Sequence, residues 1–257
     1  MQSPLRVGVV GARGEMGRAV IAAIAGRDDV ELAGASGRPG SADGDVALTS
    51  ADQVLAASEV IIDFSTAAAS TELARMAARS GSVALVMGAT GFTEQDEAAI
   101  AEASARIAIV KSGNFSLGLN VIAGLVRQAA ARLNPEDWDV ELLEWHHRRK
   151  TDAPSGTALM LGDAVAGGRG VRLSDVAVRG RDGHTGSRPG GAIGFGVLRG
   201  GGVVGEHSVI FAAEDEIVTF SHSARDRRLF ARGAIEAALW VRGKPPGLYD
   251  MAAVLGF

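Results

Sequence analysis

The 257-residue sequence contains no cysteine, and this absence excludes disulfides, thiolate metal ligands and a cysteine nucleophile. Aromatic residues are scarce, at 5% of the chain, and no basic tract interleaved with aromatic residues of the kind that binds nucleic acid is present. The formal net charge of -4 gives no bulk attraction to nucleic acid or to an anionic membrane. We therefore expect neither nucleic acid nor a membrane as a partner.

Long hydrophobic runs are also missing. No apolar stretch approaches the ~20 residues that cross a bilayer, and the first strand-like stretch is broken by Gly11, which argues against a signal peptide. We therefore expect a cytoplasmic protein. No spacing of histidines resembles a metal site, so we expect no metal. What is present is a globular composition, 47% hydrophobic and 22% charged, in a chain that can bury one large core or two smaller ones.

The first half of the chain alternates apolar strands with alanine-rich helices. Such alternation predicts a parallel sheet covered by helices on both faces, the α/β Rossmann-type doubly wound fold. The expected strands are 5–10, 30–35, 60–64, 83–87 and 107–110, and the expected helices include 14–26, 67–79 and 94–105.

The pattern changes after Asn114. A helix at 117–133 precedes a partly polar strand at 138–146, and a second helix follows Pro154. Strand-like runs at 192–198, 203–212 and 216–221 have short joins and are expected to be antiparallel neighbours. The last helix, 226–240, is expected to return to the first domain. We predict a first domain of residues 1–116 plus 226–257 and a second, mixed α+β domain of residues 117–225.

A glycine-rich turn follows the first expected strand and opens a helix. Glycine in this place permits a tight turn, close approach of the backbone to a pyrophosphate, and close packing of helix on strand. The spacing is G-x-x-G-x-x-G, one residue wider than the usual fingerprint, and its position after the first strand favours dinucleotide binding over a turn that merely packs. The candidate cofactor residues here are Gly11, Ala12, Arg13, Gly14, Glu15 and Met16.

The end of the second strand bears on the choice of cofactor. An acidic residue there would bind the ribose of NAD, but the chain has no carboxylate from Ser36 until Asp43. Ser36 and Arg38, with help from Arg13, would instead suit the 2′-phosphate of NADPH. Glu15 would oppose a phosphate if its side chain pointed inward. Both NADPH and NADH are therefore candidate cofactors, and the residues favour NADPH.

Two further turns end the fourth and fifth strands, where the nicotinamide end of a cofactor would pass. Their backbone amides and the Asn114 side chain could bind its carboxamide or ribose, although ordinary turns between strands and helices look the same. The candidate residues are Gly88, Ala89, Thr90, Ser112, Gly113, Asn114 and Phe115.

The segment from His146 to Thr157 carries the strongest signal for chemistry. His146 and His147 are adjacent at the end of a strand, where neighbouring side chains point to opposite faces, so one can donate a proton while the other contacts the substrate. Lys150 follows in a loop. Pro154 fits the first turn of a helix that would expose amide groups at its N-terminus. Lysine, histidines and a helix N-terminus together predict an anion site suited to carboxylates.

A plainer interpretation of this segment is a solvated histidine pair beside a basic surface run. The helix start in the same turn favours the functional interpretation. By contrast, His184, His207 and His222 are scattered, and we expect them to be structural or solvent-facing.

These motifs together resemble the 4-hydroxy-tetrahydrodipicolinate (dihydrodipicolinate) reductase family over nearly the whole chain. The resemblance rests on the N-terminal glycine turn, the turns at 88–92 and 113–116, and above all on the run E-W-H-H-R-R-K-T-D-A-P-S-G-T at 144–157. Ile62-Asp63-Phe64-Ser65, Val204-Gly205-Glu206-His207 and Gly247-Leu248-Tyr249-Asp250-Met251 fit it too. The family's acidic residue after the second strand is absent.

The resemblance implies an oxidoreductase of the diaminopimelate branch of lysine synthesis that uses NADPH or NADH to reduce a small cyclic dicarboxylate. His146 would be the proton donor, Lys150 would assist it by donating a proton or stabilising charge, and His147, Gly156 and Thr157 would bind a carboxylate. The second domain would bind the substrate and join subunits into a homotetramer through its sheet. The rival hypotheses are another two-domain reductase of an amino-acid precursor and a non-catalytic nucleotide sensor.

Overall fold

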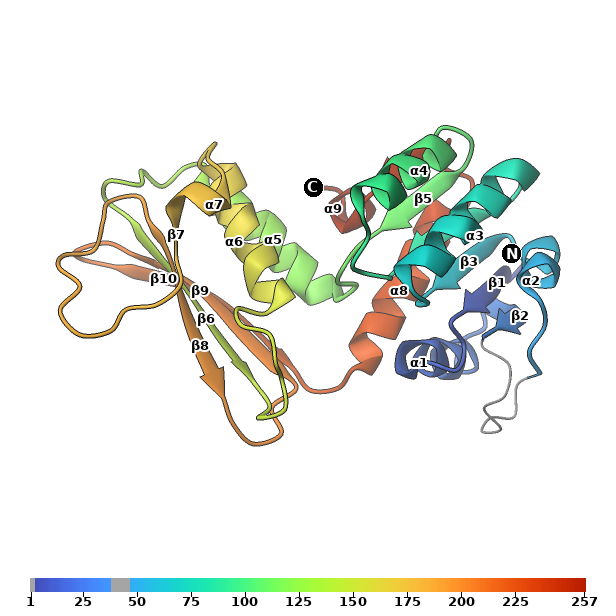
Figure 1. Cartoon of the computed structure of the whole chain (residues 1–257), viewed down its shortest axis with the longest axis horizontal. Helices are drawn as coiled ribbons and strands as arrows, with labels where there is room; N and C mark the ends of the chain where they lie inside the picture. Colours follow the sequence, from blue (N-terminus) through green and yellow to red (C-terminus); the bar gives the residue numbers. More distant parts are fainter. Residues whose placement is uncertain (1–2, 38–46) are drawn as a thin grey trace. The chain divides into compact units, whose positions relative to one another are not determined.

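The computed structural model describes residues 3–37 and 47–257 (Figure 1). Arg38, a predicted cofactor residue, lies outside the described residues. The chain forms two compact units, one made of Met1–Leu117 with Arg227–Phe257 and the other of Gly118–Asp226. Among the described residues, no helix is long and apolar enough to cross a membrane.

The first unit contains a sheet of parallel strands in the order β11-β5-β4-β3-β1-β2. This arrangement confirms the predicted doubly wound fold, with one addition. The sequence predicts five strands, and β11 adds a sixth at the edge beside β5; with three residues, it is too short to give a periodic signal. The strand bounds are β1 (Leu5–Val10), β2 (Val30–Ser36), β3 (Val60–Asp63), β4 (Ala84–Met87), β5 (Ala108–Lys111) and β11 (Gly247–Tyr249).

Helices cover both faces of this sheet, as Figure 1 shows. One face packs against α1 (Glu15–Ile24), α8 (Arg228–Val241) and α9 (Met251–Leu255). The other packs against α2 (Ala51–Ala57), α3 (Ala67–Ser80) and α4 (Glu94–Ser104). Both faces of the sheet are buried for this reason: all four residues of β3 are buried, including Asp63.

The second unit contains a mixed sheet in the order β10-β9-β6-β8-β7. Its apolar face packs against α5 (Leu117–Ala130) and α6 (Gly156–Gly168), with the short α7 (Leu173–Val176) at the edge of this core. Figure 1 shows both long helices on the same side of the sheet. The strand bounds are β6 (Asp139–His146), β7 (Ala177–Val178), β8 (Ile193–Arg199), β9 (Gly205–Ala212) and β10 (Ile217–Ala224).

The pairing of β8 in this sheet differs from the prediction. The short glycine-rich join after Arg199 predicts that β8 and β9 are antiparallel neighbours, and this is wrong, because β6 lies between them and pairs parallel with β8 and antiparallel with β9. The predicted antiparallel pairing of β9 with β10 is confirmed. The join instead crosses the end of β6, where the Gly200 amide donates to the His146 carbonyl (3.0 Å) and the Arg148 amide donates to the Gly201 carbonyl (3.3 Å). The loop therefore lies against the segment that carries the candidate catalytic residues.

On the opposite face of the mixed sheet, no helix packs among the residues that the structure describes. Leu143 and Trp145 of β6, Leu198 of β8 and Ile217 of β10 point to this face and are 40% to 67% exposed. We call these four residues the open face.

Candidate active site and cofactor site

The glycine turn after β1 has the geometry that the sequence predicts. Gly11 has φ of +78°, where a side chain would be strained, and a Cβ on it would lie 2.6 Å from the Phe64 carbonyl oxygen. A Cβ on Gly17 would lie 2.2 Å from the Gly11 carbonyl oxygen. Both positions therefore require glycine. Gly14 precedes α1 and offers no side-chain cap, so the first amide groups of the helix are not capped by it.

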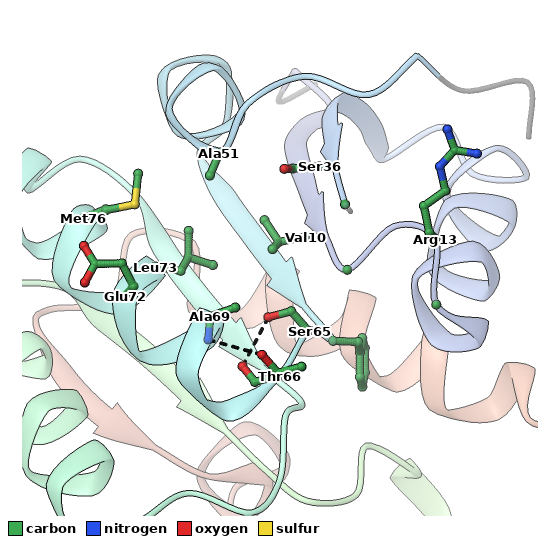
Figure 2. A pocket seen from close by; sticks show the side chains of 14 residues that line it. Val10, Arg13, Ser36, Ala51, Ser65, Thr66, Ala69, Glu72, Leu73 and Met76 are labelled. Carbon is green, nitrogen blue, oxygen red and sulfur yellow. Dashed lines mark hydrogen bonds between the residues drawn. The ribbon is translucent and has the colours of Figure 1, made fainter. Parts of the chain in front are cut away.

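A cavity of about 820 Å³ opens at this turn (Figure 2). It lies where the strand order reverses, between the turn after β1 and the residues Phe64, Ser65 and Thr66 that follow β3. Open α/β sheets bind nucleotides at this switch point. Arg13 and Ser36 also line the cavity. A glycine cradle beside a helix start, with a cation and a hydroxyl at its rim, fits the phosphate and ribose end of a dinucleotide.

The other predicted residues of the turn have different surroundings. The Ala12 amide donates to the Ser36 carbonyl (3.0 Å), and Met16 packs on the core. Glu15 is exposed and pairs with Arg227, whose Nη1 lies 2.6 Å from its carboxylate. The Glu15 carboxylate is thus already neutralised by a neighbouring cation.

The turns that follow β4 and β5 lie at the same carboxyl edge of the parallel sheet. Gly88 packs against the ring of Phe64, where a Cβ would lie 2.2 Å from a ring carbon, and Ala89 and Thr90 follow it. The Ser112 hydroxyl donates to the Asn114 carbonyl (2.8 Å), and the Ser116 amide donates to Asn114 Oδ1 (2.8 Å).

Phe115 is 1% exposed and contacts Phe64 edge to face at 5.8 Å. These internal bonds and contacts hold the turns rigid, and Gly113 leaves the backbone of the second one accessible because a Cβ there would meet nothing closer than 3.9 Å.

The predicted proton donor lies in the second unit, at the end of β6. Glu144 and His146 continue the buried face of this strand, because side chains two residues apart point the same way. Their cross-strand neighbours are His207 of β9, opposite Glu144, and Arg199 of β8, opposite His146. Three strands thus bring four polar side chains together beneath the start of α6.

Glu144 is the centre of this group and is 1% exposed. Its Oε1 accepts from Arg199 Nη2 (2.9 Å) and from the Ser155 amide (2.9 Å). Its Oε2 accepts from Arg199 Nη1 (2.9 Å) and contacts His146 Nδ1. Burial opposes ionisation of this carboxyl, but these donors outweigh it and hold the pKa of Glu144 below its usual range. Glu144 is therefore an ionised carboxylate with both oxygens fully used.

His146 is 8% exposed and presents its second nitrogen, Nε2, toward Gly205. Burial lowers the pKa of His146, and the cations Lys150 and Arg199 act in the same direction, whereas Glu144 raises it. Because the ionised Glu144 accepts a hydrogen bond, Nδ1 carries the hydrogen of the neutral ring and Nε2 is the nitrogen that can exchange a proton.

His207 lies beside His146, with ring centroids 5.0 Å apart. Burial first, and the neighbouring His146 second, lower the pKa of His207 to about 4, so the ring is neutral at cellular pH. Its Nε2 is 3.0 Å from Ser155 Oγ, which also caps α6 by accepting from the Ala158 amide (3.1 Å). Ser155 Oγ thus bonds both His207 Nε2 and the Ala158 amide, and this pair fixes the N-terminus of α6 beside His146.

A metal ion is the other ligand to consider for this group, because single donor atoms of Glu144, His146 and His207 lie within 4.8 Å of one another. Both Glu144 oxygens already accept from the Arg199 guanidinium, and His207 Nε2 is engaged by Ser155. A cation would have to displace a fixed guanidinium and approach its charge. The donors fit a hydrogen-bond network better than a metal site.

The remaining predicted residues follow in the same segment. Lys150 Nζ pairs with both oxygens of Asp152 (2.8 and 2.9 Å). His147 Nδ1 is buried without a hydrogen-bond partner among the described residues. Gly156 is exposed at the first position of α6, with open space where a Cβ would stand, and Thr157 follows it.

The start of α6 differs from the prediction in one respect. The pattern places Pro154 in the first helical turn and leaves the Ser155 amide free. In the structure Ser155 is the N-cap and Pro154 precedes it, and the Ser155 amide donates to Glu144. The helix therefore begins at Gly156, which is exposed.

Glu144 and Arg199 are site residues that the sequence does not single out. His207 is expected from the sequence to be structural or solvent-facing, but it is buried beside His146. Glu144 could have been found, because it stands two residues before His146 on an alternating strand. Arg199 and His207 come from strands whose order in the sheet is not encoded locally.

We predict that Gly205→Ala reduces kcat about tenfold, because the new methyl group would lie 3.0 Å from His146 Nε2 and displace the ring by a few tenths of an ångström. Gly202→Ala is the matched control, since a Cβ there meets nothing within 4 Å. Steady-state turnover of both variants tests this. Equal activity of the two variants would show that the space around Nε2 is not used.

Comparison with known proteins identifies relatives of the whole chain. The family model "Dihydrodipicolinate reductase, N-terminus" matches residues 5–115, and "Dihydrodipicolinate reductase, C-terminus" matches residues 118–255. A 4-hydroxy-tetrahydrodipicolinate reductase of Caulobacter vibrioides is 57% identical over 257 residues, covering 100% of this chain and 99% of the relative. One of Rhizobium rhizogenes is 50% identical, covering 98% and 97%.

Solved structures share the fold. The dipicolinate-bound dihydrodipicolinate reductase from Paenisporosarcina sp. TG-14 superposes with a TM-score of 0.78 at 22% identity, covering 96% of this chain and 97% of that one. A diaminopimelate dehydrogenase of C. glutamicum gives a TM-score of 0.52 at 15% identity, covering 97% and 93%.

Proposed function

Because this chain belongs to the dihydrodipicolinate reductase family, we propose that it reduces 4-hydroxy-tetrahydrodipicolinate to tetrahydrodipicolinate, with His146 as the proton donor. The family makes the chain an oxidoreductase that uses a nicotinamide cofactor in lysine and diaminopimelate synthesis. The observation that carries the assignment of the site is the buried Glu144–His146 pair placed beside the N-terminus of α6.

In the proposed reaction the 4-hydroxyl group leaves as water together with a hydrogen of the neighbouring ring carbon, and one hydride and one proton add to the conjugated ring that results. When bound, the cofactor supplies the hydride. The reduced ring is then an electron-rich enamine, and the enamine carbon takes a proton from His146 Nε2. A proton from water then restores the protonated form of His146. An imidazole suits this transfer because its pKa lies near cellular pH.

Protonation of His146 would be assisted by the substrate itself. Without substrate, burial and the neighbouring cations keep the pKa of His146 below its ordinary value. A bound dicarboxylate places two negative charges near the ring, and such charges favour the imidazolium form. The donor would thus be charged when the substrate is in place.

The substrate carboxylates would be held by groups that follow His146 in the chain. The exposed Gly156 and the following Thr157 begin α6, and a helix N-terminus attracts anions. Lys150 and the unpaired ring nitrogen of His147 would bind beside them. Lys150 is paired with Asp152 in the absence of substrate, and a substrate carboxylate would take over part of that pairing.

The unit built from Met1–Leu117 with Arg227–Phe257 would bind the cofactor, and Gly118–Asp226 would bind the substrate. Arg13 and Ser36 line the cavity at the end of β2, where the described residues from Leu32 to Gly37 carry no carboxylate. These groups favour NADPH over NADH, since a 2′-phosphate needs a cation and a hydroxyl rather than an acid.

The direct test of this function is oxidation of NADPH and of NADH by the purified protein, with and without freshly prepared 4-hydroxy-tetrahydrodipicolinate. We expect oxidation only with the substrate, at a lower KM for NADPH. A protein that binds the cofactor but oxidises neither form would be the nucleotide sensor of the alternative hypothesis.

The unit Gly118–Asp226, which carries the mixed sheet, would also join subunits. The open face carries four exposed apolar side chains on paired strands, a surface that a soluble sheet normally covers. We propose a homotetramer formed through this face and predict that Ile217→Glu lowers the particle mass in solution. Light scattering after size exclusion measures this. A wild-type particle with the mass of one chain would contradict the assembly.

A further inference from the structure

The Glu144 carboxylate makes more contacts than a buried structural ion pair requires. Its two oxygens accept from the Arg199 guanidinium, the Ser155 amide and His146 Nδ1. One side chain therefore connects the proposed proton donor to the N-terminus of the proposed carboxylate-binding helix. Arg199 also donates to the Asp152 carbonyl (2.7 Å), so the loop that carries Lys150 is held by the same group.

We infer that Glu144 is a positioning residue for the reaction: it fixes the tautomer and orientation of His146 so that Nε2 carries the exchangeable proton. This inference rests on the proposed role of His146. A neutral imidazole can hold its hydrogen on either nitrogen, and an ionised acceptor at Nδ1 selects the Nδ1–H form. Arg199 keeps Glu144 ionised by a two-point contact, and Ser155 ties the same carboxylate to the helix.

Glu144 also sets the charge balance around His146. The titratable or charged groups that face the ring are Glu144 on its own strand, Lys150 in the following loop, Arg199 on β8 and His207 on β9. Among them, Glu144 alone favours the imidazolium. Removing its charge should therefore lower the pKa of His146 and deplete the protonated donor at neutral pH.

The test uses Glu144→Gln, which preserves size and removes the charge. We expect kcat to fall at least about tenfold, in line with the loss of an orienting carboxylate beside a catalytic histidine. The alkaline limb of kcat/KM should move to lower pH, while NADPH binding stays unchanged. The control is Glu59→Gln. Glu59 lies just before β3 in the other unit and pairs with Arg242 (3.0 Å). Removing this charge should change turnover by less than about twofold, as for ordinary surface ion pairs.

The double variant Glu144→Gln/His146→Gln separates positioning from simple stabilisation. If Glu144 acts through His146, the double variant is no slower than His146→Gln alone; additive losses would overturn the inference. Full activity of His146→Gln would instead reject the proposed role of His146, and absence of substrate-dependent NADPH oxidation in the wild-type protein would reject the proposed function, so the failures are distinguishable.

A measurement on the unmodified protein covers the case in which Glu144→Gln does not fold. Nitrogen-15 chemical shifts of the His146 ring, assigned by their absence in His146→Gln, report which nitrogen carries the hydrogen. We expect Nδ1–H at pH 8. An Nε2–H ring would overturn the inference.

Discussion

His146→Gln should reduce kcat by about 10²- to 10⁴-fold, the usual contribution of a positioned general acid. Glutamine fills similar space but has no group that titrates near neutral pH. Because His146 lies in the unit Gly118–Asp226 and the glycine turn lies in the other unit, the affinity for NADPH should not change. Steady-state kinetics and a fluorescence titration with NADPH measure the two quantities.

The control for this variant is His184→Gln, which removes an exposed histidine from a loop of the same unit and should leave turnover unchanged. Unchanged kcat in His146→Gln would remove His146 from the mechanism. A matching loss of NADPH affinity would indicate general damage rather than loss of a donor.

Lys150→Ala should lower kcat/KM by about 10- to 10²-fold, because a charge-assisted hydrogen bond to a substrate carboxylate contributes roughly 1.5–3 kcal/mol. The Lys150 side chain is mostly buried and is aligned by Asp152, so its ammonium needs little reordering to meet an anion. The measurement is the dependence of initial rate on substrate at saturating NADPH, together with the NADPH affinity, which should not change.

Asp152→Asn is the comparison variant for Lys150→Ala. It removes the negative charge that pairs with Lys150 but keeps the lysine, so the substrate should bind as well as before or better. Equal losses of substrate and cofactor affinity in Lys150→Ala would contradict the assignment of Lys150 to the substrate.

Most of the layout of the first unit could be predicted, because most of its strands and helices carry a local sequence pattern. β3 and β5 are short, but their first three residues form continuous apolar runs between helices, and that pattern is typical of a buried parallel strand. β11 has only three residues and gives no such pattern. The position of β6 between β8 and β9 could not be predicted, since the short join after Arg199 looks like a hairpin and the true order depends on long-range pairing.

The same distinction applies to the site. His146, Lys150 and the start of α6 occupy one continuous segment, so the sequence alone indicates an anion site there. Arg199 and His207 join it only because β8 and β9 flank β6. The error in strand order therefore concealed these two residues. The sequence predicts that β8 and β9 pair with each other, but they lie on either side of β6 and place Arg199 and His207 beside the Glu144–His146 pair.

In the proposed mechanism, a bound dicarboxylate and a protonated His146 occupy one site. Calorimetric titration with pyridine-2,6-dicarboxylate at pH 7.5, repeated in buffers of different ionisation enthalpy, measures the protons taken up on binding. We predict net uptake by the wild-type protein, because the ligand raises the pKa of a ring that is neutral beforehand, and loss of that uptake in His146→Gln. Binding without proton uptake, or equal uptake in the variant, would contradict the claim.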